Sequence, residues 1–336
     1  MSIFPVGKLP ASVLEKMLTR FRVHDERVVV GPRLGEDAAA LNFGDRYLIV
    51  KSDPITFATD ELGWYAVVVN ANDIACRGAT PQWFLPTLLL PEGKTDEAMV
   101  EAIFGQIADA CAALNIAVIG GHTEITYGLD RPILSGHMLG EVAKEKLVTT
   151  SGARVGDAVI LTKGIPIEGT SIVAREKEPE LRRAGVPPAL IERAKNYLHH
   201  PGISVVKDAL LAVNTVNVHC LHDPTEGGLA TGLREVAVAA NVGLRIAAEN
   251  ITILEESKAL LSVFGLDPMG TIASGALLLT VAPEEVDALL SAFQQARISA
   301  NVIGEVVPIE QGMTLQRGGK DTPLPTFEAD EIARLF

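Results

Sequence analysis

Short apolar runs alternate irregularly with helical stretches along this chain, and their order limits the folds open to it. In the first half, the runs that predict strands are Arg27–Val30, Tyr47–Val50, Phe84–Leu90, Ile116–Ile119 and Ile133–Leu139. Helices are predicted at Glu61–Arg77 and at Asp96–Leu114, the second one started by Thr95. Because strand–helix–strand units do not repeat regularly, we predict an α+β fold of mixed sheets with helices on one face, not a doubly wound parallel sheet.

The second half of the sequence repeats this mixture. The predicted helices are Pro188–Leu198, Ile203–Val213, Gly228–Ala240, Glu255–Phe264 and Pro283–Ala296, and the predicted strands are Asn217–Leu221, Leu244–Ala247, Ala276–Val281 and Val302–Val306. The glycine-bearing stretch Ser151–Asp157 precedes a further strand and is typical of a hinge. We therefore expect two domains, at residues 1–152 and 153–336, which suits a chain of 336 residues.

The charge balance predicts an acidic surface. The chain has 29 Lys and Arg against 42 Asp and Glu, a formal net charge of −13, which repels nucleic acid and anionic membranes. The densest basic stretch, with Arg182, Arg183, Arg193 and Lys195, is interleaved with glutamates and indicates a solvated helix surface. Since neither a secretion signal nor an apolar run of the ~18 residues needed for a membrane span is found, we expect a cytoplasmic protein without nucleic-acid or membrane partners.

The three cysteines predict neither a disulfide framework nor a thiolate zinc site, because they are few and scattered. Cys76 and Cys111 fall in alanine-rich helical stretches and are expected in the core. Cys220 lies two residues before His222 on a predicted strand, so the two side chains share a face. A buried strand cysteine is the favoured interpretation, and a thiol activated by the imidazole is the alternative.

Three aspartates stand where chain geometry exposes carboxylates. Asp37 follows Gly35 in a stretch whose alanines leave room for a ligand, and Asp53 shares a strand face with Lys51. Asp73 lies on a predicted helix, on one stripe with Asn70 and Arg77. Each aspartate alone could be a turn, cap or salt-bridge residue. Together, without a Cys or His cluster, they are typical of a magnesium site that also binds phosphate.

Two glycines after a predicted strand indicate an anion-binding turn in the first half. Gly120 and Gly121 could direct backbone N–H groups toward an anion, while Thr123 offers a hydroxyl and Glu124 a carboxylate. A plain tight turn would use the same glycines. His122 could be a metal ligand, a hydrogen-bond donor to phosphate or an ordinary loop histidine.

Two loops of the second half could also bind an anion. The first contains Lys163, Gly164 and Gly169, but it lacks the spacing of a P-loop. The second contains Asp223, Thr225 and Gly227 and joins a strand to a helix, where free N–H groups could dock a substrate. Capping of that helix by Asp223 or Thr225 is the simpler interpretation of the second loop.

These motifs together resemble the PurM-like ATP-binding superfamily, which contains aminoimidazole ribonucleotide synthetase, thiamine-monophosphate kinase, selenophosphate synthetase and the hydrogenase-maturation carbamoyl dehydratase. The stretches that carry the resemblance are Gly35–Ala39, Lys51–Asp53, Val69–Ala75, Gly78–Pro81, Gly120–Glu124 and Asp223–Leu229. The resemblance implies a two-domain fold whose N-terminal sheet pairs with its copy in a homodimer. It also implies ATP and Mg²⁺ near that interface, with the C-terminal domain closing over the phosphates.

The resemblance also assigns candidate roles to residues of this sequence. The metal candidates are Asp37, Asp53, Asp73 and Glu124, with Asp223 as a further one. The ATP and phosphate candidates are Lys51, Asn70, Asn72, Gly120, Gly121, Thr123, Lys163, Gly164, Gly169, Thr225 and Gly227. The catalytic residue stays unassigned, with His122 and Asp223 as candidates.

Within the superfamily, Asp223–Leu229 and Gly265–Met269 are most similar to the hydrogenase-maturation branch. Enzymes of that branch carry the carbamoyl group on a C-terminal cysteine, whereas this sequence ends in Glu331–Phe336 and its last cysteine is Cys220. We expect an ATP- and Mg²⁺-dependent paralogue of that branch, acting on a small molecule or with a maturation partner protein. The alternatives are an aminoimidazole ribonucleotide synthetase, a small-molecule kinase, and a nucleotide-binding scaffold without turnover.

Overall fold

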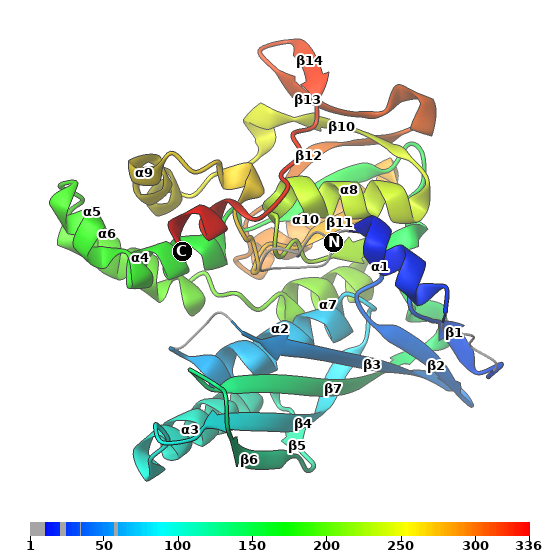
Figure 1. Ribbon diagram of the computed structural model, residues 1–336. Helices are drawn as coiled ribbons and strands as arrows, with labels where there is room; N and C mark the ends of the chain where they lie inside the picture. Colours follow the sequence, from blue (N-terminus) through cyan, green and yellow to red (C-terminus); the bar gives the residue numbers. More distant parts are fainter. Residues whose placement is uncertain (1–10, 21–24, 34, 57–59) are drawn as a thin grey trace. The chain divides into compact units, whose positions relative to one another are not determined.

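The computed structural model describes residues 11–20, 25–33, 35–56 and 60–336 (Figure 1). Their contacts form two compact units. Unit 1 contains the described residues of Met1–His24 and Pro32–Glu36 together with Val148–Phe336, and unit 2 contains Asp25–Gly31 and Asp37–Leu147. None of the helices in these ranges is long and apolar enough to cross a membrane.

Unit 2 is built on one mixed sheet. Its strand order is β1 (Val28–Val30), β2 (Ala39–Phe43), β3 (Arg46–Ile55), β7 (Ile133–Ala143), β4 (Thr80–Pro91) and β5 (Ala117–Val118), with β6 (His122–Thr126) also paired to β4. Strands β3, β7 and β4 are antiparallel neighbours and lie side by side in Figure 1, whereas β5 and β6 run parallel to β4. The long strands thus form the middle of the sheet, and the two short strands pair along one edge of β4.

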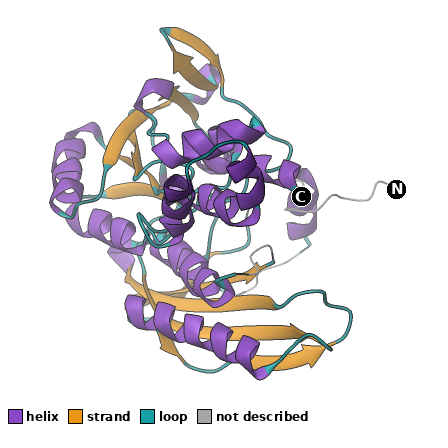
Figure 2. Cartoon of the chain, turned by 90° about the vertical axis from the view of Figure 1, so that its left-hand side faces the viewer, coloured by secondary structure: helices purple, strands orange, loops and turns teal. Residues whose placement is uncertain are grey.

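Two helices cover one face of this sheet. α2 (Leu62–Ala75) packs directly on β7, because a Cβ atom at Gly136 would lie 2.4 Å from the side chain of Asn70, and one at Gly140 would lie 2.4 Å from that of Ile74. α3 (Glu97–Leu114) packs on α2, and Figure 2 shows a helix lying along the strands of this sheet. The glycines of β7 therefore set how closely α2 approaches the strands that carry polar side chains.

Unit 1 has a second sheet with more helices. Its strand order is β14 (Lys320–Pro323), β13 (Met313–Arg317), β10 (Gly243–Ala247), β12 (Ala300–Val307), β8 (Ala158–Thr162), β11 (Leu278–Val281) and β9 (Val218–His222). Its helices are α1 (Ala11–Leu18), α4 (Ile167–Glu176), α5 (Glu178–Arg183), α6 (Pro188–Lys195), α7 (Val206–Thr215), α8 (Gly228–Ala240), α9 (Glu255–Phe264) and α10 (Val286–Gln295). One core cluster joins α8 to the inner side chains of this sheet.

The α+β class with mixed sheets is confirmed, and α8 and α9 have the bounds that the sequence predicts. Strands β2, β13 and β14 and the helices α4 and α5 were not predicted, because glycines and prolines around them indicate loops. Residues His122–Glu124, expected in a loop that begins with Gly120 and Gly121, are part of strand β6. Asp96, not Thr95, caps α3 by accepting a hydrogen bond from the N–H of Met99 at 2.9 Å.

The units also divide the chain differently from the expected boundary at residues 152 and 153. Unit 1 begins again at Val148, because the short turn Thr150–Gly152 packs on α8 and β9. Gly152 lies so close to β9 that a Cβ atom there would be 2.0 Å from the carbonyl oxygen of His219. In addition, α1 belongs to unit 1, although it precedes all of unit 2 in the sequence.

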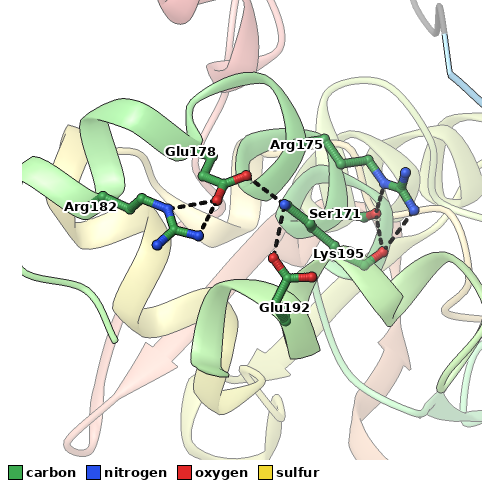
Figure 3. Close-up of polar contacts among 6 residues, drawn as sticks. All are labelled: Ser171, Arg175, Glu178, Arg182, Glu192 and Lys195. Atoms are coloured by element: carbon green, nitrogen blue, oxygen red, sulfur yellow. Dashed lines mark hydrogen bonds and ion pairs between the residues drawn. The ribbon is translucent and has the colours of Figure 1, made fainter. Parts of the chain in front are cut away.

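The basic stretch between residues 175 and 195 is neutralised by ion pairs (Figure 3). Glu178 binds the guanidinium of Arg182 at 2.5 Å and the ammonium of Lys195 at 2.5 Å. Lys195 also pairs with Glu192, while Ser171 and Arg175 donate to its backbone carbonyl oxygen. The prediction of a helix surface on which basic side chains are interleaved with glutamates agrees with this arrangement of charges.

Candidate functional site

The aspartates singled out in the first half of the sequence gather in unit 2. Asp53 lies on β3, Asp73 lies on α2, and Asp37 lies in the loop before β2. The side chain of Asp73 is 7% exposed, whereas that of Asp53 is 38% exposed. The group therefore reaches from the protein interior to the surface, with Asp53 at its open side.

Lys51 connects these carboxylates. Its ammonium lies 2.9 Å from Asp73 Oδ2 and 3.4 Å from Asp53 Oδ2, and its side chain is largely buried. Asp37 is bound instead by the fully buried Arg77, whose guanidinium lies 3.3 Å from Asp37 Oδ2. Three carboxylates thus share two cations within one part of unit 2.

Electrostatics in this group oppose full ionisation of Asp73. Burial, together with repulsion from Asp37 and Asp53, raises the pKa of Asp73 to about 7 despite the attraction of Lys51. Burial alone would lower the pKa of Lys51, but the attraction of Asp73 and Asp53 outweighs it and raises that pKa. Lys51 is therefore a permanent cation here, and a further cation would favour the ionised form of Asp73.

Asn70 and Asn72, expected to contact ATP, are both fully buried in α2. The side-chain amide of Asn70 donates to the carbonyl oxygens of Asp53 at 3.2 Å and Ala66 at 2.8 Å. Asn70 therefore fixes the backbone of β3 at Asp53. In this structure it positions a carboxylate rather than facing a ligand.

The donor set fits a hard divalent cation. Mg²⁺ prefers oxygen ligands and is usually held by one or two carboxylates, with water and phosphate completing its coordination. Asp53 and Asp73 supply carboxylate oxygens on either side of the Lys51 ammonium, and Asp37 adds negative charge nearby. The aspartates of this group would hold the ion.

The glycine turn and its neighbours form a separate group at the sheet edge. His122, Thr123 and Glu124 are exposed on β6, and the imidazole of His122 lies 3.1 Å from Glu124 Oε2. Gly121 has φ of +151°, and a Cβ atom there would lie 2.5 Å from the carbonyl oxygen of Pro86, so the turn after Gly120 needs glycine. Strands β7 and β4 separate β6 from β3. Three strand spacings amount to about 14 Å, so these residues do not join the aspartates within one chain.

The loop after β8 uses its polar groups internally. The ammonium of Lys163 donates to the carbonyl oxygen of Ser204 at 2.6 Å and lies 3.3 Å from Asp208 Oδ2. Burial lowers the pKa of Lys163 against the attraction of Asp208. The N–H groups of Lys163 and Gly164 are bound to backbone carbonyl oxygens of unit 1. This loop therefore presents neither its ammonium nor these N–H groups to an anion.

Gly169, expected in the same phosphate cradle, lies inside α4. A Cβ atom there would be 2.4 Å from the side chain of Thr271 and 2.9 Å from the carbonyl oxygen of Ile272. Gly169 thus allows close packing of α4, and the structure gives it no exposed position for a ligand.

The loop before α8 binds a carboxylate of the chain itself. Gly227, with φ of +83°, donates its N–H to Asp330 Oδ2 at 2.7 Å at the start of the helix. Asp223 is buried at the end of β9, and the carbonyl oxygen of Thr225 accepts from the N–H of Gly228. At this helix start, where the sequence predicts docking of an anionic substrate, the N–H of Gly227 binds a carboxylate of the chain itself, which the sequence did not indicate.

Several buried charged residues near these sites were not predicted as functional, Asp208 beside Lys163 among them. Arg77, although noted on its helix stripe, was not assigned to the site, and Glu168 and Asp330 were not singled out. Arg77 could have been found, because an arginine in an alanine- and valine-rich helix signals a buried charge with a partner. Glu168 and Asp330 carry no such local signal.

Comparison with known proteins matches both halves of the chain. Residues 35–142 match the AIR synthase related protein N-terminal domain, and residues 154–313 match the AIR synthase related protein C-terminal domain. The carbamoyl dehydratase HypE of Rhizobium leguminosarum is 28% identical over 284 residues, covering 82% of this chain and 78% of the relative. The thiamine-monophosphate kinase of Pyrococcus horikoshii is 28% identical over 233 residues, covering 66% and 69%.

Solved structures agree in fold. The structure of a HypE–HypF complex matches with a TM-score of 0.73 at 22% identity and covers 94% of this chain and 100% of that one. The two mixed sheets and their helices define a two-unit α+β protein, with clustered carboxylates in one unit. The chain belongs to the AIR synthase related protein family.

Proposed function

We propose that this protein is an ATP- and Mg²⁺-dependent enzyme that activates or phosphorylates an oxygen of its substrate. The observation that carries the proposal is the gathering of Asp37, Asp53 and Asp73 around two cations in unit 2. Family membership supports it, since a solved structure of HypE in complex with ATP has a TM-score of 0.67 to this chain at 23% identity.

The residues of this group would have different roles in binding a nucleotide. Asp53, at the open side, and Asp73, in the interior, would hold magnesium, which offsets charge that develops on a transferred phosphoryl group. Asn70 keeps Asp53 in place through its backbone. Arg77 keeps the Asp37 carboxylate beside this group.

A homodimer would complete this site. Val50, Leu139 and Trp83 pair across three strands on the sheet face opposite to α2 and remain only half-buried, while Ile125 and Tyr127 are exposed at the β6 edge. An apolar sheet face and edge of this kind favour a second sheet as cover. A second copy would also supply another β6 group, which the aspartates of one chain do not reach.

The reaction we favour is a cytoplasmic one related to hydrogenase maturation, with a maturation partner protein or a small molecule as acceptor. The HypE relatives and the HypE–HypF structure support this branch. The thiamine-monophosphate kinase match keeps a small-molecule kinase as the second candidate, beside ring closure of a formylglycinamidine ribonucleotide.

ADP release in the presence of Mg²⁺ tests the proposal. It would be measured against a panel of carbamoyl-bearing thiols and amides, phosphorylated vitamins and purine-pathway intermediates. Turnover with one class identifies the acceptor. Mg²⁺-dependent ATP binding without ADP release under any condition would indicate a scaffold instead, and absence of ATP binding would overturn the proposed function.

A further inference from the structure

Lys51 occupies the centre of the candidate metal site. Its ammonium lies within 3.4 Å of both Asp53 and Asp73, and these two carboxylates are the ones that a metal ion would need. Lys51 and Asp53 leave the same face of β3, and Asp73 approaches from α2, so the three groups converge from two packed elements. The protein thus places its own cation where an added cation would be attracted.

The charges near this point almost balance without a metal. Three carboxylates, Asp37, Asp53 and Asp73, face the cations Lys51 and Arg77, which leaves a formal charge of −1 when all are ionised. A free divalent cation would therefore meet one carboxylate in excess and a repelling ammonium beside Asp73 Oδ2. Without Lys51, the excess would be two carboxylates.

Exposure and side-chain type distinguish the two internal cations. Arg77 is fully buried at the end of α2, whereas the side chain of Lys51 is 20% exposed and lies beside Asp53 at the open side. A lysine side chain has a flexible four-carbon stem and a compact charge, so its ammonium can move to a new anionic partner. Lys51 is therefore the cation that can leave.

We propose that Lys51 is an internal counter-cation that keeps free Mg²⁺ out of the site and yields its place only when phosphate oxygens of a nucleotide offer its ammonium another partner. This inference rests on the proposed function and specifies the order in which metal and nucleotide bind. Metal and nucleotide would enter together, and metal alone would bind weakly.

Binding of Mn²⁺ without nucleotide, measured by electron paramagnetic resonance, tests the proposal. The proteins compared are wild type, Lys51→Met, Lys51→Arg and the control Lys94→Met, which removes an exposed lysine paired with Asp130. We expect Lys51→Met to bind Mn²⁺ at least tenfold more tightly than wild type. Lys51→Arg and Lys94→Met should bind it as weakly as wild type, because the first keeps the charge and the second leaves the site unchanged.

Equal Mn²⁺ affinity of Lys51→Met and wild type would overturn the proposal, and so would tight binding by Lys51→Arg. Circular dichroism melting verifies that each variant is folded, and Lys51→Gln replaces Lys51→Met if the methionine variant is not. Calorimetry of a non-hydrolysable ATP analogue with wild type is run in parallel. If wild type does not bind the ATP analogue, the proposed function is overturned. The Mn²⁺ comparison alone tests whether Lys51 excludes the metal.

Discussion

Replacing Glu168 by glutamine should make the stability of this protein less dependent on pH. Glu168 is the second residue of α4 and is 7% exposed. Ser274 binds its carboxylate, while Oε2 finds no hydrogen-bond partner among the described residues. Burial, with repulsion from Asp330, raises the pKa of Glu168 from 4.5 to about 7.

The sign follows from proton linkage. The folded protein binds the Glu168 proton more tightly than the unfolded chain does, so the free energy of unfolding falls as the pH rises from 4.5 through 7. This contribution is fully present below pH 4.5 and lost above pH 7. A pKa rise from 4.5 to about 7 corresponds to about 3 kcal/mol in total, most of which is lost between pH 5 and pH 8.

This effect is measured by urea unfolding at pH 5 and pH 8. The proteins compared are wild type, Glu168→Gln and the exposed control Glu310→Gln. The unfolding free energy of Glu168→Gln relative to wild type should rise by about 2 to 3 kcal/mol from pH 5 to pH 8, because glutamine does not ionise. Any constant offset from the amide cancels in the comparison of the two pH values. For Glu310→Gln, the unfolding free energy relative to wild type should be the same at both pH values. The same result for Glu168→Gln would refute the reasoning.

Three further outcomes are expected. Asp73→Asn should weaken Mg²⁺–ATP binding in calorimetry without unfolding the protein, and unchanged affinity would remove Asp73 from the metal site. Cys220→Ala should keep ATP turnover within a few-fold at a stability cost of about 1 kcal/mol, because this thiol is fully buried; an ATP-dependent covalent adduct on Cys220 in mass spectrometry would contradict this. The wild-type protein should sediment as a dimer at micromolar concentration and Leu139→Glu as a monomer, whereas a wild-type monomer that still binds ATP would contradict the composite site.

Periodicity was sufficient for the elements whose apolar pattern is regular. α8 and α9 have the predicted bounds, since each presents a continuous apolar stripe to a core cluster. α4 was missed because the glycine within it indicates a loop, while close packing against Thr271 is what favours glycine at that position. Such packing involves residues about 100 positions apart and leaves no local signal.

In the candidate site, too, some residues could be predicted from the sequence and others could not. Asp37, Asp53 and Asp73 could be singled out from local geometry, and the structure brings them together. The roles of Asn70 and Lys163 could not be predicted, because each has the chemistry of a phosphate ligand but is buried with internal partners. Burial depends on the approach of α2 to β7 and of α7 to β8, which no single segment of sequence specifies.

The discontinuity of unit 1 affects synthesis of the protein. All of unit 2 has been translated once Leu147 is added, whereas unit 1 needs α1 from the beginning and strands up to β14 near the end of the chain. The remaining 189 residues, 336 minus 147, take about 10 to 40 s at 5–20 residues per second. During that time unit 2 can fold on the ribosome. The apolar side of α1 stays without its packing partners until the rest of unit 1 has been translated. The nascent chain is therefore expected to depend on chaperones mainly for α1 and the strands of unit 1.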